Sequence, residues 1–329
     1  NHFDNEAVRN SYFAYPRDVK TYEAQLGDDA GRIFEVVNSY FGSIFTYLYA
    51  HCFFDFQALG ADDPWFAPGA PYPTSVDWWD NSVQAFAANR QFCIDRAAFY
   101  PFSFHENSWG LGAVQRPDGR YEGRYGAVPF DNGPGHDGVV ALYGPQSSLP
   151  FFRTFSSENL NDNVGFQAIA HFYNNVYDNV YGPYGFYDSY DHRGNFSTVY
   201  LGIDQGASVL MMENYRSGLV WNTFMQHEKM KSVLRLIFPN SFDWFDINIR
   251  NVLDDQPVPE LGFGTHAVGT GVVNAEQYIE LMFNFELPTS RIVIYTDNQH
   301  NPNPYIGEGE GAGLVGADDA TQVAPLYWI

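Results

Sequence analysis

Acidic side chains within apolar or glycine-rich sequence are the residues of this chain best suited to chemistry. Glu213 follows four apolar residues inside a predicted helix, Asp204 stands where that helix begins, and Glu106 lies in a glycine-rich segment beside Trp109. Cleavage of a glycosidic bond needs one carboxylic acid to protonate the leaving oxygen and one carboxylate to activate water or attack carbon. Burial raises the pKa of the acid toward the useful range. The candidate catalytic residues are therefore Asp204, Glu213 and Glu106.

Each of these three acids also has a purely structural interpretation. Arg216 lies three residues after Glu213 on the same helical face, so the two side chains can form a buried ion pair. Asp204 can cap free N–H groups at the start of its helix. Glu106 can be a solvent-exposed loop acid. The sequence leaves both interpretations open for all three.

Other polar and aromatic residues near these acids are candidates for holding a sugar. Aromatic rings present flat apolar faces with polar rims to neutral sugars, although most rings pack into cores. An aspartate in a loop can instead hydrogen-bond its own backbone in a turn. The candidates for substrate binding are Trp109, His136, Asp137, Tyr187, Asp188, Gln205 and His51.

No metal or cofactor motif stands out in the chain. It contains neither a His-Glu-x-x-His segment nor a Cys-x-x-Cys pair, and only Cys52 and Cys93 are cysteines. The two thiols can pair if their helices are neighbours, or both can be buried and free. Residues 297–301 carry oxygen donors of the kind that calcium prefers, but a plain turn explains them too. We predict no cofactor, with calcium at 297–301 as the alternative.

The charge and hydrophobicity of the chain limit its partners. The net charge is −22, and the lysines are Lys20, Lys229 and Lys231 alone. Phosphate backbones and anionic membranes repel such a surface, so we expect neither nucleic acid nor a membrane surface as a partner. No apolar stretch reaches the length of a membrane span. A neutral oligosaccharide or polysaccharide is the expected ligand.

Hydrophobic spacing divides the chain into a helical part and a β-rich part. Apolar residues three and four apart predict a mainly α domain over residues 1–245, whereas alternation with a period of two begins after about residue 240. Residues 246–329 should form a β-sandwich-like module whose chain ends inside a strand. The glycine-rich segments 99–137 and 181–188 are loops that can build a site. The expected helices are 30–50, 76–98, 138–148, 160–176 and 204–236, and the expected strands are 277–283 and 291–296.

Four segments together resemble the glucoamylase-like family that includes bacterial endo-β-1,2-glucanases. The resemblance covers about residues 35–238 and implies an (α/α)6 toroid, in which loops at one end of the inner helices build a sugar cleft. It further implies a glycoside hydrolase acting on β-glucan, with Asp204 and Gln205 pointing into the cleft. The segments are His51-Cys52-Phe53-Phe54-Asp55; Glu106-Asn107-Ser108-Trp109-Gly110-Leu111; Asp137-Gly138-Val139-Val140 with Ser147-Ser148-Leu149-Pro150-Phe151; and Tyr184-Gly185-Phe186-Tyr187-Asp188 with Leu201-Gly202-Ile203-Asp204-Gln205-Gly206 and Met212-Glu213-Asn214-Tyr215-Arg216-Ser217-Gly218-Leu219-Val220-Trp221.

The chain departs from this family in two respects. It has fewer predicted helices than a full toroid needs, so we expect a missing N-terminal segment or a further chain to complete the ring. In the synthase branch of the family an acidic residue closely follows the Trp-Gly pair, whereas residues 112–115 here are Gly-Ala-Val-Gln. The resemblance therefore favours inversion over retention.

Two functional hypotheses follow from these observations. The first is an extracytoplasmic glycoside hydrolase, and the second is a catalytically inactive structural or assembly protein of the cell envelope that uses the same fold. An open strand edge at the C-terminal end of the chain would offer a pairing site for another chain or a second copy. The N-terminal residues 1–4 do not form a signal peptide, which indicates a mature or trimmed start.

Overall fold

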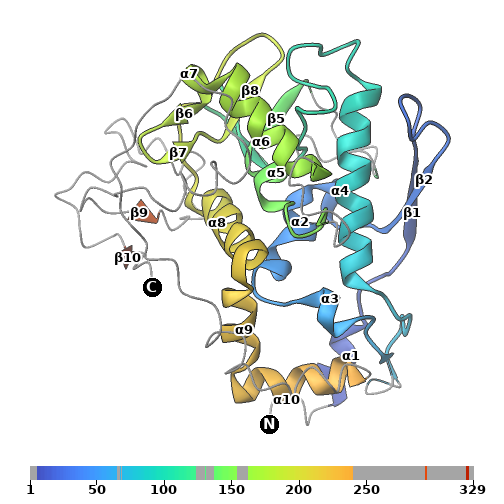
Figure 1. Cartoon of the computed structure of the whole chain (residues 1–329). Helices are drawn as coiled ribbons and strands as arrows, with labels where there is room; N and C mark the ends of the chain where they lie inside the picture. Colours follow the sequence, from blue (N-terminus) through green and yellow to red (C-terminus); the bar gives the residue numbers. More distant parts are fainter. Residues whose placement is uncertain are drawn as a thin grey trace.

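The fold was taken from a computed structural model, which describes residues 6–64, 67, 69–123, 130, 137–153, 162–239, 293–294 and 324–325. The described part is mainly helical, as the sequence predicts (Figure 1). The closed (α/α)6 ring remains a prediction. The helices are α1 (Glu6–Tyr12), α2 (Ile44–Leu48), α3 (Phe56–Leu59), α4 (Trp78–Asp95), α5 (Tyr143–Ser147), α6 (Val164–Asn175), α7 (Tyr177–Val180), α8 (Gly202–Ser217), α9 (Leu219–Met225) and α10 (Glu228–Ile237).

The strands are short and pair two by two. The longest pair, β1 (Val19–Glu23) with β2 (Ile33–Val37), is an antiparallel hairpin. β5 pairs antiparallel with β8, although they lie far apart in the sequence. The remaining strands are β3 (Val114–Gln115), β4 (Tyr121–Glu122), β5 (Val139–Ala141), β6 (Tyr181–Gly182), β7 (Gly185–Phe186), β8 (Ser189–Asp191), β9 (Val293–Ile294) and β10 (Ala324–Pro325).

The prediction of one long helix over residues 30–50 is wrong. Residues 33–37 form β2, in which Phe34 and Val36 are buried while Ile33 and Glu35 face solvent. Burial therefore alternates with the period of a strand. A 3₁₀ turn (Tyr40–Gly42), the short α2 and a second 3₁₀ turn, η3 (Tyr49–Cys52), follow it. The β-branched residues of β2 fit a pleated surface better than a helix.

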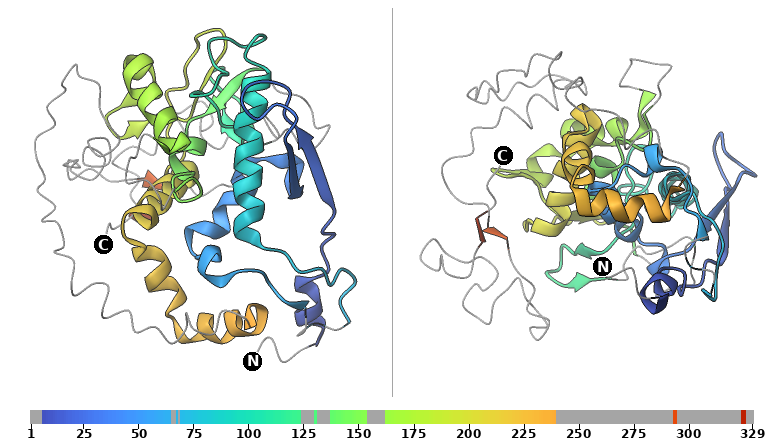
Figure 2. Two further views of the ribbon diagram at one scale, coloured as in Figure 1. Left: turned by 45° about the vertical axis from the view of Figure 1, so that its right-hand side comes forward. Right: turned by 90° about the horizontal axis from the view of Figure 1, so that it is seen from below.

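Helix α4 confirms the helix predicted over 76–98 and anchors the β1–β2 hairpin. Asp77 accepts a hydrogen bond from the Asp80 N–H and caps its start. Near its end, the buried Asp95 accepts hydrogen bonds from the Tyr22 hydroxyl at 2.6 Å and the Leu26 N–H at 2.8 Å. The hairpin consequently lies along α4, as two views show (Figure 2).

The helix predicted over 204–236 is present but divided into three. Helix α8 ends at Gly218, which takes the left-handed conformation with φ 68° that glycine adopts without strain. Helix α10 begins after His227, whose side chain accepts a hydrogen bond from the Lys229 N–H.

The helix predicted over 160–176 is confirmed as α6. Residues 138–148, predicted as one helix, form strand β5 followed by α5.

The segment from Met212 to Trp221, one of those that carry the family resemblance, holds α8 and α9 against η3. The Asn214 amide donates to the Cys52 carbonyl at 2.9 Å and accepts from the Trp221 N–H at 3.1 Å. The Trp221 indole N–H donates to the His51 carbonyl at 2.6 Å. Because these buried backbone groups need partners, the Asn and Trp of this segment have a structural role.

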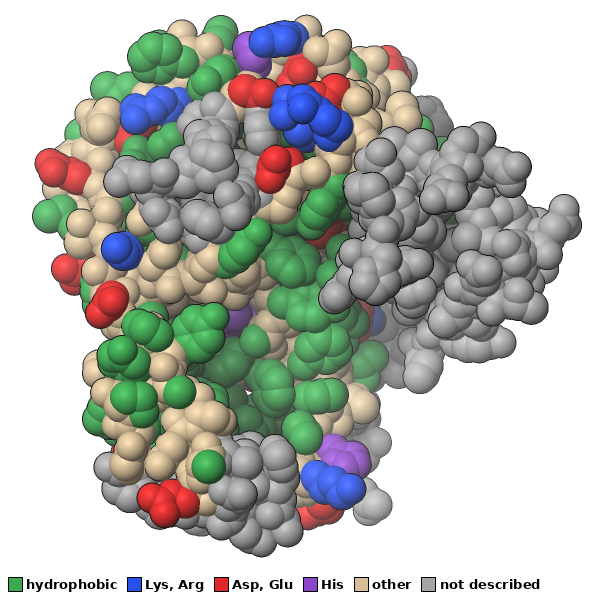
Figure 3. Space-filling model, turned by 180° about the vertical axis from the view of Figure 1, so that it is seen from behind, with side chains coloured by type: hydrophobic (Ala, Val, Ile, Leu, Met, Phe, Trp, Pro, Cys, Tyr) green, Lys and Arg blue, Asp and Glu red, His purple; other side chains and the backbone are tan. Residues whose placement is uncertain are grey.

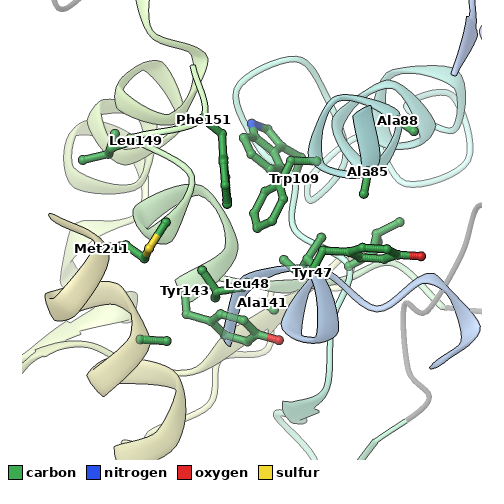
Figure 4. Packing of buried hydrophobic residues seen from close by; sticks show 14 of the residues in the cluster. Tyr47, Leu48, Ala85, Ala88, Trp109, Ala141, Tyr143, Leu149, Phe151 and Met211 are labelled. Atoms are coloured by element: carbon green, nitrogen blue, oxygen red, sulfur yellow. The ribbon is translucent and has the colours of Figure 1, made fainter. Parts of the chain in front are cut away.

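The core lies between α4, α5, α6 and α8. Figure 4 shows Trp109 and Phe151 between the helices that carry Ala85 and Met211, with Tyr143 and Leu48 beneath them. Cys52 and Cys93 are both buried and free, so of the two alternatives left open the unpaired thiols are the ones observed.

The C-terminal β-rich module is largely outside the described residues. The predicted strand 277–283 lies there, and of 291–296 only Val293–Ile294 is described, as β9 paired antiparallel with β10. The module therefore remains a prediction. Within the described residues, no helix combines the length and the hydropathy that a bilayer crossing needs.

Candidate active site

Two buried carboxyl groups meet at the first turn of α8. Asp204 belongs to that turn, and Asp188 lies between β7 and β8. Neither side chain is accessible, with residue exposures of 2% for Asp204 and 0% for Asp188. The two side chains hydrogen-bond each other. Because two adjacent carboxylates in a buried site cannot both be ionised, one of them must carry a proton.

Backbone hydrogen bonds fix the position of Asp188. Its own N–H donates to the Val199 carbonyl at 3.1 Å, and its carbonyl accepts from the Leu142 N–H at 3.0 Å. The Gln115 N–H donates to Asp188 Oδ2. A hydrogen bond donated to a carboxylate favours its charged form. When the pair ionises, its negative charge is therefore assigned to Asp188 and the remaining proton to Asp204.

The electrostatics of the pair agree with this assignment. Burial raises the pKa of Asp188 to about 7. The pKa of Asp204 lies well above its ordinary value because of burial and, next, because of the charge on Asp188. Asp204 is thus the member of the pair that holds its proton more strongly. A carboxyl group held neutral by an apolar site is suited to donate that proton as a general acid.

The neighbourhood of the pair has unused hydrogen-bonding capacity. Among the described residues, four buried side-chain atoms here have no hydrogen-bond partner: Asp188 Oδ1, Asp204 Oδ2, Gln115 Oε1 and Gln205 Nε2. Buried polar atoms in proteins are nearly always paired, although Trp109 Nε1 and His51 Nδ1 in the core of this chain are also unpaired. Three acceptors and one donor are a set that hydroxyl groups, which both donate and accept, can satisfy.

Two glycines of the Trp-Gly-Leu-Gly segment allow its chain to pack behind the site. Gly110 has φ 135°, and a Cβ there would lie 2.3 Å from the Ala141 carbonyl oxygen. A Cβ on Gly112 would lie 2.1 Å from the Tyr143 hydroxyl. That hydroxyl donates to the Ala113 carbonyl at 3.1 Å. The segment thereby delivers the Gln115 N–H to Asp188.

Two predicted sugar-binding residues are core residues instead. Trp109 has no exposed surface and packs edge-to-face against Phe86 and Phe152. His51 is 3% exposed, its Nε2 hydrogen-bonds the Ser82 hydroxyl at 2.8 Å, and burial lowers its pKa to about 3. In this structure both rings are covered by protein. Both sit where the packing of α2, η3, α4 and α5 closes over them, which a local sequence does not reveal.

The acids Glu213 and Glu106 differ from the expectation of a buried acid. Glu213 forms a two-pronged ion pair with Arg216, at 2.8 and 2.9 Å, and accepts from the Ser217 hydroxyl. Its structural interpretation is therefore the one observed. Glu106 is exposed on its loop, so it lacks the burial that would make it a general acid.

The other predicted residues lie on loops or in the first turn of α8. Asp137 forms an ion pair with Arg116 at 2.8 Å. Tyr187 is half-buried against Tyr200, and Gln205 follows Asp204 in α8. His136 lies outside the described residues. Sequence reasoning missed Gln115 because its contribution is a backbone N–H, which any residue except proline supplies.

The face opposite to that of Figure 1 is hollowed. Figure 3 shows hydrophobic side chains gathered around a hollow across the middle of this face. Large exposed hydrophobic residues of the chain include Tyr49, Leu219 and Phe224. Hollows with apolar walls are the usual form of ligand sites.

Within the described residues, no cluster of three or more His, Cys, Asp or Glu is placed to hold a metal ion, and the calcium alternative at 297–301 lies outside them.

The described part is thus a mainly helical domain in which a residue between β7 and β8 and a residue of the first turn of α8 form a buried pair of carboxyl groups. The family model "Glycoamylase: Putative glucoamylase" matches residues 5–228, and the chain belongs to this family. The resemblance found in the sequence is thereby confirmed. The family match begins nearer the N-terminal end than the segments that first showed the resemblance.

Two relatives of known type match the chain. An exo beta-1,2-glucooligosaccharide sophorohydrolase of Parabacteroides distasonis is 26% identical over 163 residues, which are 49% of this chain and 20% of that protein. The solved endo-beta-1,2-glucanase of Chitinophaga pinensis, in complex with sophorotriose and glucose, is 27% identical with a TM-score of 0.53. That match covers 70% of this chain and 49% of that one. The chain thus spans half or less of the length of these relatives.

Proposed function

We propose that this chain carries part of the active site of a glycoside hydrolase that acts on β-glucan, with β-1,2-linked glucan as its substrate. The observation that carries the proposal is the buried, proton-sharing pair Asp188–Asp204 within the family domain. The linkage is proposed from the relatives, which are named for β-1,2-glucan and its oligosaccharides. The net charge of −22 supports a neutral substrate, and a polysaccharide substrate supports an extracytoplasmic location.

In the proposed reaction Asp204 is the general acid. Its proton passes to the glycosidic oxygen as the bond to the anomeric carbon breaks, while water attacks that carbon and loses a proton to a second carboxylate. Asp188 then faces a second negative charge. Their repulsion favours return of a proton to Asp204, which restores the acid for the next cycle.

The second carboxylate must come from outside the pair. Inverting enzymes hold their two carboxyl groups roughly 6.5–9.5 Å apart, on opposite faces of the sugar. Asp188 and Asp204 touch each other, so they act as one unit on one face. Glu106 and Asp137 have the solvent access that a base activating water needs. We propose inversion, with one of these two as the base.

The proposal is tested by incubating the complete protein with β-1,2-, β-1,3- and β-1,4-glucans and measuring new reducing ends. We expect release from the β-1,2-linked polymer. Replacing Asp204 by Asn keeps the shape of the side chain and removes the proton, so the rate should fall roughly 10²–10⁴-fold. Nuclear magnetic resonance of the first product reports its anomeric configuration. Release from none of the three glucans would reject the proposal.

One observation favours a second candidate function, that of an inactive structural or assembly protein of the cell envelope. Neither carboxyl group of the pair has the exposed surface that contact with a substrate requires. Such a protein would keep the pair for packing alone. It would then bind glucan without releasing reducing ends, or would neither bind nor cleave it.

A further inference from the structure

Three tyrosines beside the acid pair form one connected unit. Tyr184 lies in the turn of the β6–β7 hairpin, Tyr187 follows β7, and Tyr200 precedes α8. The rings of Tyr187 and Tyr200 are 4.9 Å apart at 43°, and those of Tyr184 and Tyr200 are 5.5 Å apart at 78°. We call these three residues the tyrosine shelf.

Hydroxyl contacts hold the shelf together. The Tyr184 N–H donates to the Tyr200 hydroxyl at 3.4 Å. Gly182 lies directly beneath: a Cβ there would come within 2.0 Å of the Tyr200 hydroxyl and 2.6 Å of the Tyr187 hydroxyl. The absence of a side chain at Gly182 therefore lets both hydroxyls lie against the hairpin.

The shelf remains open to solvent although it is built from large rings. Tyr184 is 48% exposed, and Tyr187 and Tyr200 are half-buried. A group of partly exposed tyrosines with hydroxyls at its rim presents both apolar faces and hydrogen-bonding groups. These are the two features with which proteins hold a neutral, hydroxylated ring.

The shelf is joined to the acid pair by the backbone. Tyr187 directly precedes Asp188, and the Asp188 N–H donates to the carbonyl of Val199, the residue before Tyr200. Consecutive Cα atoms are about 3.8 Å apart, so Tyr187 lies one residue from Asp188, and Tyr200 lies one residue from Val199, the backbone partner of Asp188. The shelf and the pair are therefore neighbours along the backbone.

We propose that the tyrosine shelf is a saccharide-binding subsite that holds a glucose unit of the β-glucan next to the acid pair. The proposal rests on the proposed function for the identity of the sugar. The shelf contributes to affinity, and the pair contributes to the chemical step. The two contributions are therefore separable by experiment.

The test measures the affinity for sophorotriose by calorimetric titration, in a chain that carries Asp204→Asn so that the ligand is not consumed. Tyr184→Ala removes the most exposed ring of the shelf, and we expect it to weaken binding roughly three- to tenfold. Tyr184→Phe keeps the ring and should retain most of the affinity. The matched control is Tyr15→Ala, because Tyr15 is 82% exposed and lies near the other end of the sequence.

A second measurement uses the chain without the Asn substitution. Tyr184→Ala should raise KM for β-1,2-glucan by a similar factor and leave kcat nearly unchanged. If Tyr184→Ala and the control Tyr15→Ala weaken binding equally, the proposal is contradicted. It is also contradicted if Tyr184→Ala and Tyr187→Ala both bind sophorotriose as tightly as the chain with its tyrosines intact. Absence of any sophorotriose binding would overturn it too.

These results separate the two proposals. Binding that depends on Tyr184, without any hydrolysis by the unmutated chain, would keep the shelf and reject the hydrolase. Hydrolysis that is insensitive to Tyr184→Ala and Tyr187→Ala would keep the hydrolase and reject the shelf. Circular dichroism of each variant checks that the hairpin has not unfolded.

Discussion

At the scale of single residues, the properties of the acid pair follow from contact and burial. A lone aspartate in water is ionised at neutral pH. Here each carboxyl lies against the other without solvent, and a backbone N–H from Gln115 selects which one carries the charge. The chemistry therefore belongs to the pair and to the segment that donates to it. It does not belong to either aspartate alone.

The raised pKa values predict how stability depends on pH. Between about pH 4 and about pH 7 the native chain holds a proton on Asp188 that the unfolded chain releases. The free energy of unfolding should therefore be highest at the acid end of this window and fall as pH rises, by about 1.4 kcal/mol per pH unit for each extra proton. Asp204, whose native pKa is also raised, holds a second such proton and makes the fall steeper.

Urea denaturation from about pH 5 to about pH 8 measures this dependence. The double variant Asp188→Asn/Asp204→Asn has no titrating group at the site, so its stability should vary less steeply with pH than that of the unmutated chain. Equal slopes for the two proteins would show that the pair does not hold an extra proton in the native state.

Glu213 is expected to affect stability and not catalysis. Its carboxylate is engaged by Arg216 and Ser217, and the Glu213 side chain is 12% exposed. Glu213→Gln should lower the free energy of unfolding by roughly 1 kcal/mol and leave the rate of glucan cleavage within about twofold. Asp204→Asn is the comparison, with its roughly 10²–10⁴-fold loss of rate. A rate loss of that size in Glu213→Gln would restore Glu213 as a catalytic residue.

At the scale of elements, glycines determine where loops can approach the helices. Gly110 combines φ 135° with a neighbouring carbonyl oxygen where a Cβ would lie, whereas Gly206 lies inside α8 with nothing within 4 Å of a Cβ. The first glycine is required by the fold. The second costs helix stability through the entropy of the unfolded chain.

These two glycines predict opposite effects of the same substitution. Gly110→Ala should lower the free energy of unfolding by roughly 2 kcal/mol or more through strain and overlap. Gly206→Ala should raise it by about 0.5–1 kcal/mol. Midpoints of urea denaturation compare the two variants directly. Destabilisation by both would mean that the surroundings of Gly206 are tighter than described.

At the scale of the whole molecule, one continuous core joins the hairpin, the loops and α4 to α8. Cys52 and Cys93 lie within it, and burial raises the pKa of both thiols, that of Cys52 to about 12. Thiols react as thiolates and need access to the reagent. The two cysteines can therefore report whether this core opens.

We expect neither thiol to react appreciably with a thiol reagent in the native chain, and both to react once urea unfolds it. The rate of labelling at intermediate urea should follow the fraction of unfolded protein measured by circular dichroism. The unfolded chain, in which two thiols should be titrated without a reductant, is the control. Rapid labelling of either cysteine under native conditions would indicate a local opening around η3 or α4.

The sequence by itself determined the elements whose signal is local. The 3.6-residue spacing in 76–98 and 160–176 predicted α4 and α6 because each helix buries one face along its own length. Gly218 interrupts the predicted 204–236 helix through its own backbone conformation. The order of short segments from His51 to Trp221 was enough for the family. The sequence also predicted Asp188 as a binding residue and Asp204 as a catalytic residue. It did not indicate that the two side chains lie together.

Only the tertiary structure decided which side chains meet and which are covered. Residues 33–37 became a strand because β1 was available to pair with them, and their β-branched side chains fit that pairing. Trp109 and His51 looked like ligand contacts until the packing of other elements buried them. Asp188 and Asp204 share a proton because the Val199 and Gln115 backbones bring the β7–β8 link to the start of α8. Burial and pairing depend on contacts between distant segments, and those contacts, rather than residue type, set the pKa values from which the function was inferred.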